Sequence, residues 1–446
     1  MPSGQPGLRL VADAVVPVAP AGVVHAPGVV DVVGDRVAWV GPAADAPPTG
    51  AQTLDVGGLL MPGLVNTHAH TPMTLFRGAG DGLPLLRWLT EAIWPREARM
   101  EDADARVGML LGAHELLTCG VTTTCEMYLH GRAVLEASVD SGIRCVYTAA
   151  IFDLPGAGPG ATWQAFLEQA RQLHQEFDGA EGRITVGFAP HAAYTVPPAG
   201  LEAAAAAALE HDALLQIHVA ETADEDRAVR DEHGCSVPGL LARLGVLEAR
   251  VLAAHSIWLD RTDLDLYGAH DVAVAHCPGS NAKLGSGVAP LAEFLRRGIR
   301  VGLGTDGPAS NDDLDLWEEL RLAPQLARAT AGDPAAVSTE TALDLATAGG
   351  ARALGLAAGT LTPGALADVV RLDLDDSRFV PALDHGELVS HLVWAASSRL
   401  VTDVWVGGRR VVADRRCLTV DGPAVRAEAR ARAVRLAGSG GVRTAP

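Results

Sequence analysis

The chain has 446 residues, of which 48% are hydrophobic and only 4% aromatic, so its core must consist mostly of Ala, Val and Leu. Its formal net charge is −19 and no basic run is interleaved with aromatic residues, which argues against nucleic acids and anionic membrane surfaces as partners. No run of 18 or more apolar residues could span a membrane. The six cysteines form no CxxC pair, as expected of buried thiols in a reducing compartment, so we expect a cytoplasmic protein.

Residues 1–58 are expected to form short strands and turns. Within them the segment DVVGDRVAWVG, residues 31–41, predicts a hairpin with a Gly-Asp turn. This stretch is too short to stand alone as a domain, so it should associate with another part of the chain.

Between about residues 60 and 330, short β-branched runs alternate with longer helical patterns. Eight runs are candidate strands: GLVNTHAH, GVTTTCEMY, RCVYTAAIFD, RITVGFAPHAAY, LLQIHVAET, VLAAHS, VAVAHCPGSN and RVGLGTDG. The intervals leave room for helices, one of which is predicted over residues 161–177 from the apolar face that begins at Trp163 and ends at Phe177. This α/β pattern predicts a (β/α)8 TIM barrel over residues 59–358, whose active site would lie at the C-terminal ends of the strands.

Residues from 359 onward return to Gly-punctuated strand pairs, in GTLTPGALADVVRLD and VTDVWVGGRRVVAD. We therefore predict that residues 1–58 and 359–446 combine into one small β-sandwich domain beside the barrel. The tail ARARAVRLAGSGGVRTAP, residues 429–446, is expected to begin as a helix and to end in disorder.

His68 and His70 alternate at the end of the first candidate strand, so their rings should point to the same side. Alone, this pair is weak evidence, because chance yields roughly half such a pair in a chain with 15 histidines. However, His218 ends the fifth strand, His255 the sixth and Asp306 the eighth. Side chains of these types are costly to bury unpaired, so their recurrence at strand ends favours a metal site over a purely structural role.

Three neutral imidazoles and one carboxylate suit a divalent cation such as Zn²⁺ or Fe²⁺. Glu221 lies three residues after His218 and could exchange a proton in the same site. The residues therefore predict metal-assisted hydrolysis, in which the cation lowers the pKa of a water molecule to about 7.

The motifs PGLVNTHAH, IHVAET, AAHS and GTDGPASN resemble the strand-end motifs of the amidohydrolase superfamily, and GTLTPGALADVVRLD resembles its C-terminal sandwich segment. The resemblance covers nearly the whole chain. It implies that His68, His70, His218 and Asp306 bind the metal and that His255 lies beside the bound water. Binuclear relatives use a lysine on the fourth strand, whereas the single lysine here, Lys283, lies beyond the seventh, so one metal per chain is expected, most simply Zn²⁺, with Fe²⁺ or Mn²⁺ as alternatives.

Within the superfamily, the stretch NTHAHTPMTLFRGAGDGLPLLRWLTEAIWPREARM, together with FAPHAAY, CPGSNAKLGSG and TDGPASNDDLDLWEELRLA, is similar to deaminases acting on 5′-methylthioadenosine and S-adenosylhomocysteine. The resemblance implies hydrolytic removal of the 6-amino group of an adenine nucleoside, which releases ammonia and an inosine-type product. Glu221 would carry a proton to ring N1 and then to the departing ammonia. His255 and Asp306 would hold and deprotonate the attacking water.

Four further residues match substrate contacts of these deaminases. Glu97 matches an acid that accepts hydrogen bonds from the ribose hydroxyls, and Trp88 matches an aromatic residue of the pocket wall. His191 matches a histidine that contacts the nucleoside, and Ser310 a hydroxyl at the purine N7 edge. Each also has an ordinary structural interpretation. Glu97 could be an acid at the start of a helix and Trp88 a core residue, while His191 could be a histidine with its hydrogen bonds satisfied in the fold and Ser310 a turn residue. His276, at the end of the seventh strand, is expected to be structural.

Relatives that act on S-adenosylhomocysteine hold its carboxylate with arginines at and beyond the third strand, but no arginine occurs here from Cys145 to Gln164. We therefore expect adenosine, 5′-deoxyadenosine or 5′-methylthioadenosine as the substrate rather than S-adenosylhomocysteine. The alternatives are a free-base deaminase (guanine- or pterin-like), an s-triazine amino- or chlorohydrolase on the same metal site, and a barrel retained as a non-enzymatic scaffold. Since relatives are commonly oligomeric, we expect a homo-oligomer.

Overall fold

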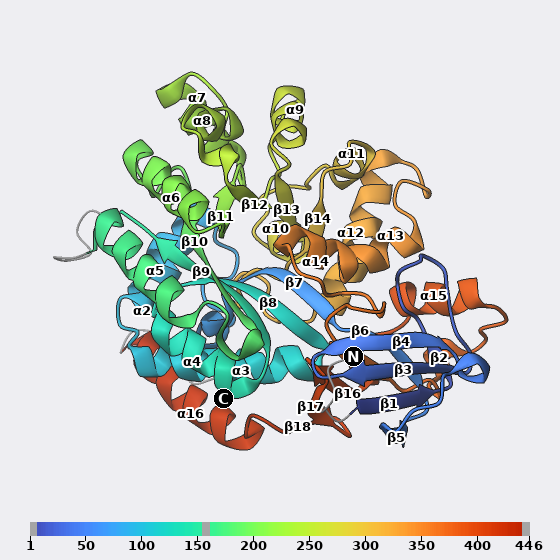
Figure 1. The fold of residues 1–446 in the computed structure, drawn as a ribbon. Helices are drawn as coiled ribbons and strands as arrows, with labels where there is room; N and C mark the ends of the chain where they lie inside the picture. Colours follow the sequence, from blue (N-terminus) through green and yellow to red (C-terminus); the bar gives the residue numbers. More distant parts are fainter. Residues whose placement is uncertain (1–6, 154–160, 439–446) are drawn as a thin grey trace.

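The computed structural model describes residues 7–153 and 161–438 (Figure 1). Within these ranges, eight parallel strands form one sheet, in which each strand pairs with the next along the chain. They are β7 (Leu64–Ala69), β8 (Val121–Tyr128), β9 (Arg144–Ile151), β10 (Ile184–Pro190), β11 (Leu214–Val219), β12 (Arg250–His255), β13 (Ala273–His276) and β14 (Val301–Leu303). The predicted (β/α)8 barrel is confirmed.

The barrel closes where the last strand, β14, meets the first, β7. The Thr67 hydroxyl donates to the carbonyl of Leu303 at 2.9 Å, and the Asp306 amide donates to the carbonyl of His68 at 2.9 Å. Gly302 is required here, since a Cβ at this position would lie 2.3 Å from Cγ2 of Thr67. This closure brings the end of β14 beside the end of β7.

Helices surround the barrel (Figure 1). They are α3 (Asp102–Thr118), α4 (Gly131–Ser141), α5 (Trp163–Phe177), α6 (Pro198–Glu210), α7 (Ala223–His233), α8 (Val237–Arg243), α9 (Arg261–Ala269), α10 (Pro278–Lys283), α11 (Leu291–Arg296), α12 (Leu316–Ala331), α13 (Thr339–Leu345) and α14 (Ala348–Leu354). The helix predicted over residues 161–177 is α5, and the Thr162 hydroxyl caps it by accepting a hydrogen bond from the amide of Ala165. The alanine-rich α6 buries four alanines against its neighbours, as a small-residue core requires.

Both ends of the chain form β-sheets beside the barrel (Figure 1). One sheet has the order β4-β3-β1-β5 and the other the order β18-β17-β16-β15-β6-β2. Their strands are β1 (Gly7–Ala12), β2 (Ala14–Val15), β3 (Gly28–Val33), β4 (Arg36–Pro42), β5 (Gln52–Asp55), β6 (Leu59–Pro62), β15 (Val369–Leu372), β16 (Val401–Val406), β17 (Arg409–Ala413) and β18 (Arg416–Cys417). Leu10, Leu60 and Trp405, from the two sheets, share one hydrophobic cluster.

The hairpin predicted over residues 31–41 is the antiparallel pair β3 and β4, joined at Gly34 and Asp35. The strands of both chain ends therefore combine, as predicted, whereas the domain boundaries after residues 58 and 358 stay a prediction. Strand β6, which begins at Leu59, pairs with β15 and β2.

Two helices complete the C-terminal part, α15 (His385–Trp394) and α16 (Gly422–Ala437). Helix α16 packs on α3, where the buried Asp104 carboxylate accepts a hydrogen bond from Nη1 of Arg432 at 2.9 Å. The predicted helical start of the tail is confirmed, while the disorder predicted for its end falls on residues 439–446, outside the described residues. In the described ranges, no helix combines the length and the apolar character needed to cross a membrane.

Candidate metal centre and active site

The ends of β7, β11 and β14 bring the four predicted metal ligands together. Nε2 of His68 and Nε2 of His70 lie 3.3 and 3.2 Å from Oδ1 of Asp306, and Nε2 of His218 lies 3.2 Å from Nε2 of His68. Zinc holds nitrogen and oxygen ligands at about 2.0–2.1 Å, so tetrahedral ligands would be about 3.3 Å apart. The observed separations therefore suit ligands of one cation. Among the described residues, two overlapping groups have all their ligand atoms within 4.8 Å of one another: His68 with His70 and Asp306, and His68 with His218 and His255.

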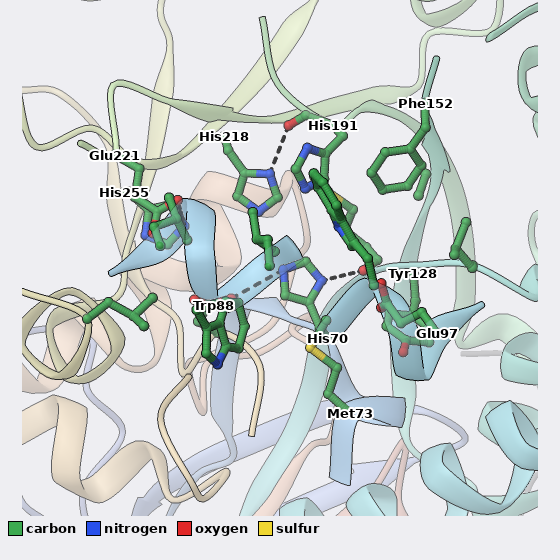
Figure 2. A pocket seen from close by; sticks show the side chains of 18 of the residues that line it. His70, Met73, Trp88, Glu97, Tyr128, Phe152, His191, His218, Glu221 and His255 are labelled. Atoms are coloured by element: carbon green, nitrogen blue, oxygen red, sulfur yellow. Dashed lines mark hydrogen bonds and ion pairs between the residues drawn. The ribbon is translucent and has the colours of Figure 1, made fainter. Parts of the chain in front are cut away.

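The remaining ring nitrogens of two of these histidines are held by backbone carbonyls (Figure 2). Nδ1 of His70 donates to the carbonyl of Met127 at 2.5 Å, and Nδ1 of His218 donates to the carbonyl of His191 at 2.8 Å. With the proton on Nδ1, each neutral ring directs an Nε2 lone pair into the cluster. Lone pairs and a carboxylate facing one another repel, so the donor set fits a divalent cation between them.

Burial controls the protonation of these rings. It lowers the pKa of His68 to about 4 and that of His218 well below the ordinary value, so both are neutral at pH 7, the form that binds metals. Burial also lowers the pKa of His70, but the Asp306 carboxylate outweighs it and the net pKa is raised. The Asp306 carboxylate thus favours positive charge at this position, as it would favour a bound cation.

Glu221 and His255 lie on the pocket side of the cluster. Nε2 of His255 is 3.8 Å from Oε2 of Glu221, and Nδ1 of His255 is 2.8 Å from Oδ1 of Asn281. Burial raises the pKa of Glu221, so this carboxyl retains a proton closer to neutral pH than a solvated glutamate does. The site therefore has a carboxyl that can give and take a proton next to an imidazole.

A pocket of about 610 Å³, including the space at its mouth, opens above these groups (Figure 2). Its walls are largely apolar and include Leu85, Met127, Leu129, Phe152 and Leu284. Among the described residues that line it, none is a lysine or an arginine. The pocket thus combines a polar, metal-competent floor with uncharged walls, as small-molecule sites commonly do.

Trp88 and Glu97 both line this pocket and come from one segment between β7 and α3. The segment consists of α1 (Leu85–Arg87), a π-helical turn (Trp88–Ile93) and α2 (Trp94–Glu97); π-helical turns are frequent at functional sites. The indole nitrogen of Trp88 donates to the carbonyl of Ala79 at 2.9 Å. Burial raises the pKa of Glu97, although Tyr128 and His70 act in the opposite direction.

His191 also lines the pocket, where its ring packs 4.6 Å from that of Phe152. Its Nδ1 lies 2.9 Å from the Thr195 hydroxyl, and burial lowers its pKa to about 3, so the ring is neutral. The structure therefore brings His191 together with Trp88 and Glu97 in one pocket.

Ser310 lies behind the metal cluster rather than on the pocket wall. Its hydroxyl is buried and lies 2.9 Å from Oδ2 of Asp306. Its predicted contact with a purine stays a prediction. His276, the last residue of β13, is buried and does not line the pocket, so its structural role also remains an expectation.

The family model for the amidohydrolase family matches residues 59–411, most of the chain. The chain belongs to the amidohydrolase family. Its fold and its strand-end histidines are those that the sequence motifs led us to expect.

Two curated relatives of this amidohydrolase are deaminases. It is 41% identical over 417 residues to a 5-methylthioadenosine/S-adenosylhomocysteine deaminase of Pelotomaculum thermopropionicum, covering 93% of this chain and 95% of the relative. It is 41% identical over 359 residues to a 5′-deoxyadenosine deaminase of Methanothermobacter thermautotrophicus, covering 80% and 83%.

Among solved structures, this amidohydrolase resembles an adenosine deaminase from Xanthomonas campestris with bound zinc. The TM-score is 0.91 at 36% sequence identity, and the match covers 96% of this chain and 98% of that one. The sequence motifs, the geometry of the site and the relatives therefore all indicate a metal-dependent hydrolase with a histidine-rich centre.

Several residues that line the amidohydrolase pocket or lie behind its metal cluster were not identified from the sequence. Tyr128 ends β8 and Phe152 directly follows β9, so the same strand-end criterion that found the histidines would have found both. Ser280 and Asn281 lie within the motif CPGSNAKLGSG, which carried the resemblance without a role for either residue.

Proposed function

We propose that this amidohydrolase hydrolytically removes the 6-amino group of an adenine nucleoside, with release of ammonia and an inosine-type product. The observation that carries this proposal is that Glu97 lies in the same pocket as Glu221 and the metal cluster. One part of the pocket thus offers hydrolytic chemistry, and another offers an acceptor for a ribose diol. The deaminase relatives point to the same reaction.

The proposed ligands of the cation are His68, His70, His218 and Asp306. When bound, the cation would supply Lewis acidity and lower the pKa of a water molecule to about 7. Glu221, whose pKa is raised by burial, would protonate ring N1, then take the proton of the new C6 hydroxyl and pass it to the departing amino group. His255 and Asp306 would orient the water and accept its first proton, which later returns to Glu221 and restores its neutral form.

The nucleoside would be held by the other residues of the pocket. The Glu97 carboxylate can accept hydrogen bonds from both ribose hydroxyls, which a free base or a triazine lacks. Trp88 and His191 offer flat surfaces along the pocket wall. Ser310 would act on the purine only if it reached the pocket from its position behind Asp306.

The 5′ substituent should be small and uncharged. The described lining residues include no lysine or arginine, and the sequence has neither between Cys145 and Gln164. Glu97, Glu221 and Asp306 already make the pocket acidic. A homocysteine carboxylate would find no cationic partner there, so adenosine, 5′-deoxyadenosine or 5′-methylthioadenosine is favoured over S-adenosylhomocysteine.

A substrate screen tests this function. The zinc-loaded enzyme is assayed with adenosine, 5′-deoxyadenosine, 5′-methylthioadenosine, S-adenosylhomocysteine, guanine and melamine. Nucleoside turnover is followed by the absorbance change from adenine to hypoxanthine, and the other reactions by released ammonia. We expect a higher kcat/KM for 5′-methylthioadenosine than for S-adenosylhomocysteine. Turnover of guanine or melamine without turnover of any nucleoside would favour the alternative, a free-base deaminase or s-triazine hydrolase.

We further infer one cation per chain, zinc being the best match to the donor set, with Fe²⁺ or Mn²⁺ as alternatives. Removal with a chelator should abolish activity, and reconstitution followed by mass-spectrometric metal analysis should give one metal per chain. Two metals per chain would contradict the mononuclear site. A homo-oligomer in the cytoplasm stays a prediction, which light scattering of the purified protein and fractionation of cells would test.

A further inference from the structure

Helix α10 (Pro278–Lys283) follows β13 and lies behind the metal cluster, where Ser280 and Asn281 are fully buried without lining the pocket. These two adjacent residues contact the two side chains that flank the proposed water. Ser280 contacts Asp306, and Asn281 contacts His255. The helix ends at Lys283, whose Nζ donates to Oδ2 of Asp312 at 2.6 Å.

Asp306 uses its two carboxylate oxygens differently. Oδ1 faces the rings of His68 and His70. Oδ2 lies 2.6 Å from the Ser280 hydroxyl and 2.9 Å from the Ser310 hydroxyl, and the two hydroxyl oxygens are 3.0 Å apart. Two buried donors thus converge on Oδ2, which leaves Oδ1 as the oxygen that is directed into the cluster.

His255 is oriented from its other side. Oδ1 of Asn281 can only accept a hydrogen bond, so Nδ1 of His255 carries the proton and donates to it at 2.8 Å. Nε2 of His255 then keeps a lone pair on the side of Glu221, 3.8 Å away. His255 has φ 67° and Asp306 has φ 60°, so both backbones are in the left-handed region and depend on their surroundings to stay there.

One buried carboxyl of α12, that of Glu319, forms hydrogen bonds with both the segment that carries Ser280 and the segment that carries Ser310. Its Oε2 accepts a hydrogen bond from the amide of Gly279 at 2.9 Å, and its Oε1 accepts one from Nδ2 of Asn311 at 2.8 Å. Gly279 immediately precedes Ser280, and Asn311 immediately follows Ser310. The two hydroxyls that converge on Asp306 are therefore fixed relative to each other through α12.

We propose that Ser280, Ser310 and Asn281 are positioning residues that orient Asp306 and His255 around the cation and the attacking water. This inference rests on the proposed metal-dependent function and extends it to buried residues that do not line the pocket. It gives Ser310 a role that its buried place behind Asp306 supports. Partners of this kind typically change metal affinity or activity by about 10- to 100-fold when they are removed.

The test uses the full chain reconstituted with Co²⁺, whose absorption spectrum reports on ligand geometry. In the double variant Ser280→Ala/Ser310→Ala, we expect the Co²⁺ dissociation constant to rise about 10- to 100-fold and the visible bands to shift. Each single variant should show a smaller change, because the remaining hydroxyl still binds Oδ2. The control is Ser138→Ala, which removes a buried hydroxyl of α4 bonded to the carbonyl of Val134 and should leave both readouts unchanged.

Asn281 is tested separately. Asn281→Ala should lower kcat with little change in KM, whereas Asn281→Asp, which can still accept from Nδ1 of His255, should restore much of kcat. Equal losses in both variants would overturn the assignment of Asn281.

Unchanged Co²⁺ affinity and spectrum in a folded double variant would overturn the role of the two serines. If the double variant does not fold, the single variants decide by the same readouts. Because Co²⁺ binding needs no substrate, a chain that binds Co²⁺ as expected but deaminates no nucleoside would contradict the proposed function and leave this inference intact.

Discussion

Glu97, Glu221 and Asp306 line one pocket, but their surroundings give each carboxyl a different task. Asp306 receives two hydroxyls on one oxygen and faces two imidazoles with the other, so it stays ionised as a ligand must. Glu221 is buried next to His255, and its raised pKa suits proton transfer. Glu97 lies on the wall beside Tyr128, where an acceptor for hydroxyl groups is useful.

At Glu97, the change Glu97→Ala should raise KM for nucleosides at least about tenfold, because hydrogen bonds to a charged group contribute about 1.5–3 kcal/mol each. Steady-state kinetics measure KM, and metal analysis of the same preparation measures the metal content. Glu91→Ala, which removes an exposed acid from the same segment, is the matched control and should leave KM unchanged. Loss of metal from Glu97→Ala would contradict the ribose assignment.

At Glu221, the change Glu221→Gln keeps the shape of the side chain but removes the proton carrier. We expect kcat to fall by about 10²- to 10⁴-fold, the usual contribution of general acid–base catalysis, with one metal per chain retained. Glu202→Gln, on the exposed side of α6, should behave like the wild type. If kcat of Glu221→Gln stayed within a few-fold of the wild type, another group would have to carry the proton.

Helices α10 and α12 illustrate how an element can matter without reaching the pocket. Glu319 of α12 accepts hydrogen bonds from Gly279 and Asn311, although burial makes its charged form costly. Burial raises the pKa of Glu319 to about 8, from an ordinary value of 4.5. The folded chain therefore keeps a proton on Glu319 that the unfolded chain has already lost.

This difference gives the free energy of unfolding a pH dependence. The stabilisation from neutral Glu319 is fully present below about pH 4.5 and is lost as the pH rises to about 8, with a slope of about 1.4 kcal/mol per pH unit between these values. Glu319→Gln cannot ionise in this range and should flatten this decline, as urea titrations between pH 4.5 and 8 would measure, although it loses one of the two hydrogen bonds that Glu319 accepts. Glu318→Gln, an exposed neighbour on the same helix, should keep the wild-type slope.

On the scale of the whole molecule, the barrel and the terminal sheets are joined by a buried ion pair. Arg144 begins β9, and Asp368 immediately precedes β15. Nε and Nη2 of Arg144 donate to the two carboxylate oxygens at 2.8 and 3.0 Å, and the amide of Gly407 adds a third bond at 2.7 Å. Both side chains are almost fully buried, so the charge of each depends on the other for compensation.

Asp368→Ala should therefore lower the free energy of unfolding by about 3–5 kcal/mol, because it leaves the Arg144 guanidinium buried and unpaired. Denaturant titration measures this loss, and kcat of the folded fraction should change little because the pair lies outside the pocket. Breaking the exposed pair of Arg87 and Glu91 with Glu91→Ala is the comparison and should have little effect on stability. Similar losses in both variants would mean that burial of the pair is unimportant.

The sequence predicted the site residues that lie at the C-terminal ends of successive barrel strands. His68, His70, His218 and Asp306 were found because strand ends converge in a barrel, whatever the loops do. The segment that carries Trp88 and Glu97 was found only by resemblance, since its π-helical turn follows no regular pattern. Contacts such as Ser280 with Asp306 join residues that are distant in the chain, and they exist only once β13 and β14 lie side by side.

The lysine at the end of α10 has a practical consequence. Lys283 is the only lysine of the chain, its side chain is 22% exposed, and the next residue, Leu284, lines the pocket. An amine-directed fluorophore would therefore find a single ε-amino group, one residue along the chain from the pocket wall. Because every other basic side chain of this amidohydrolase apart from the histidines is an arginine, a label on Lys283 offers a way to follow occupancy of the pocket.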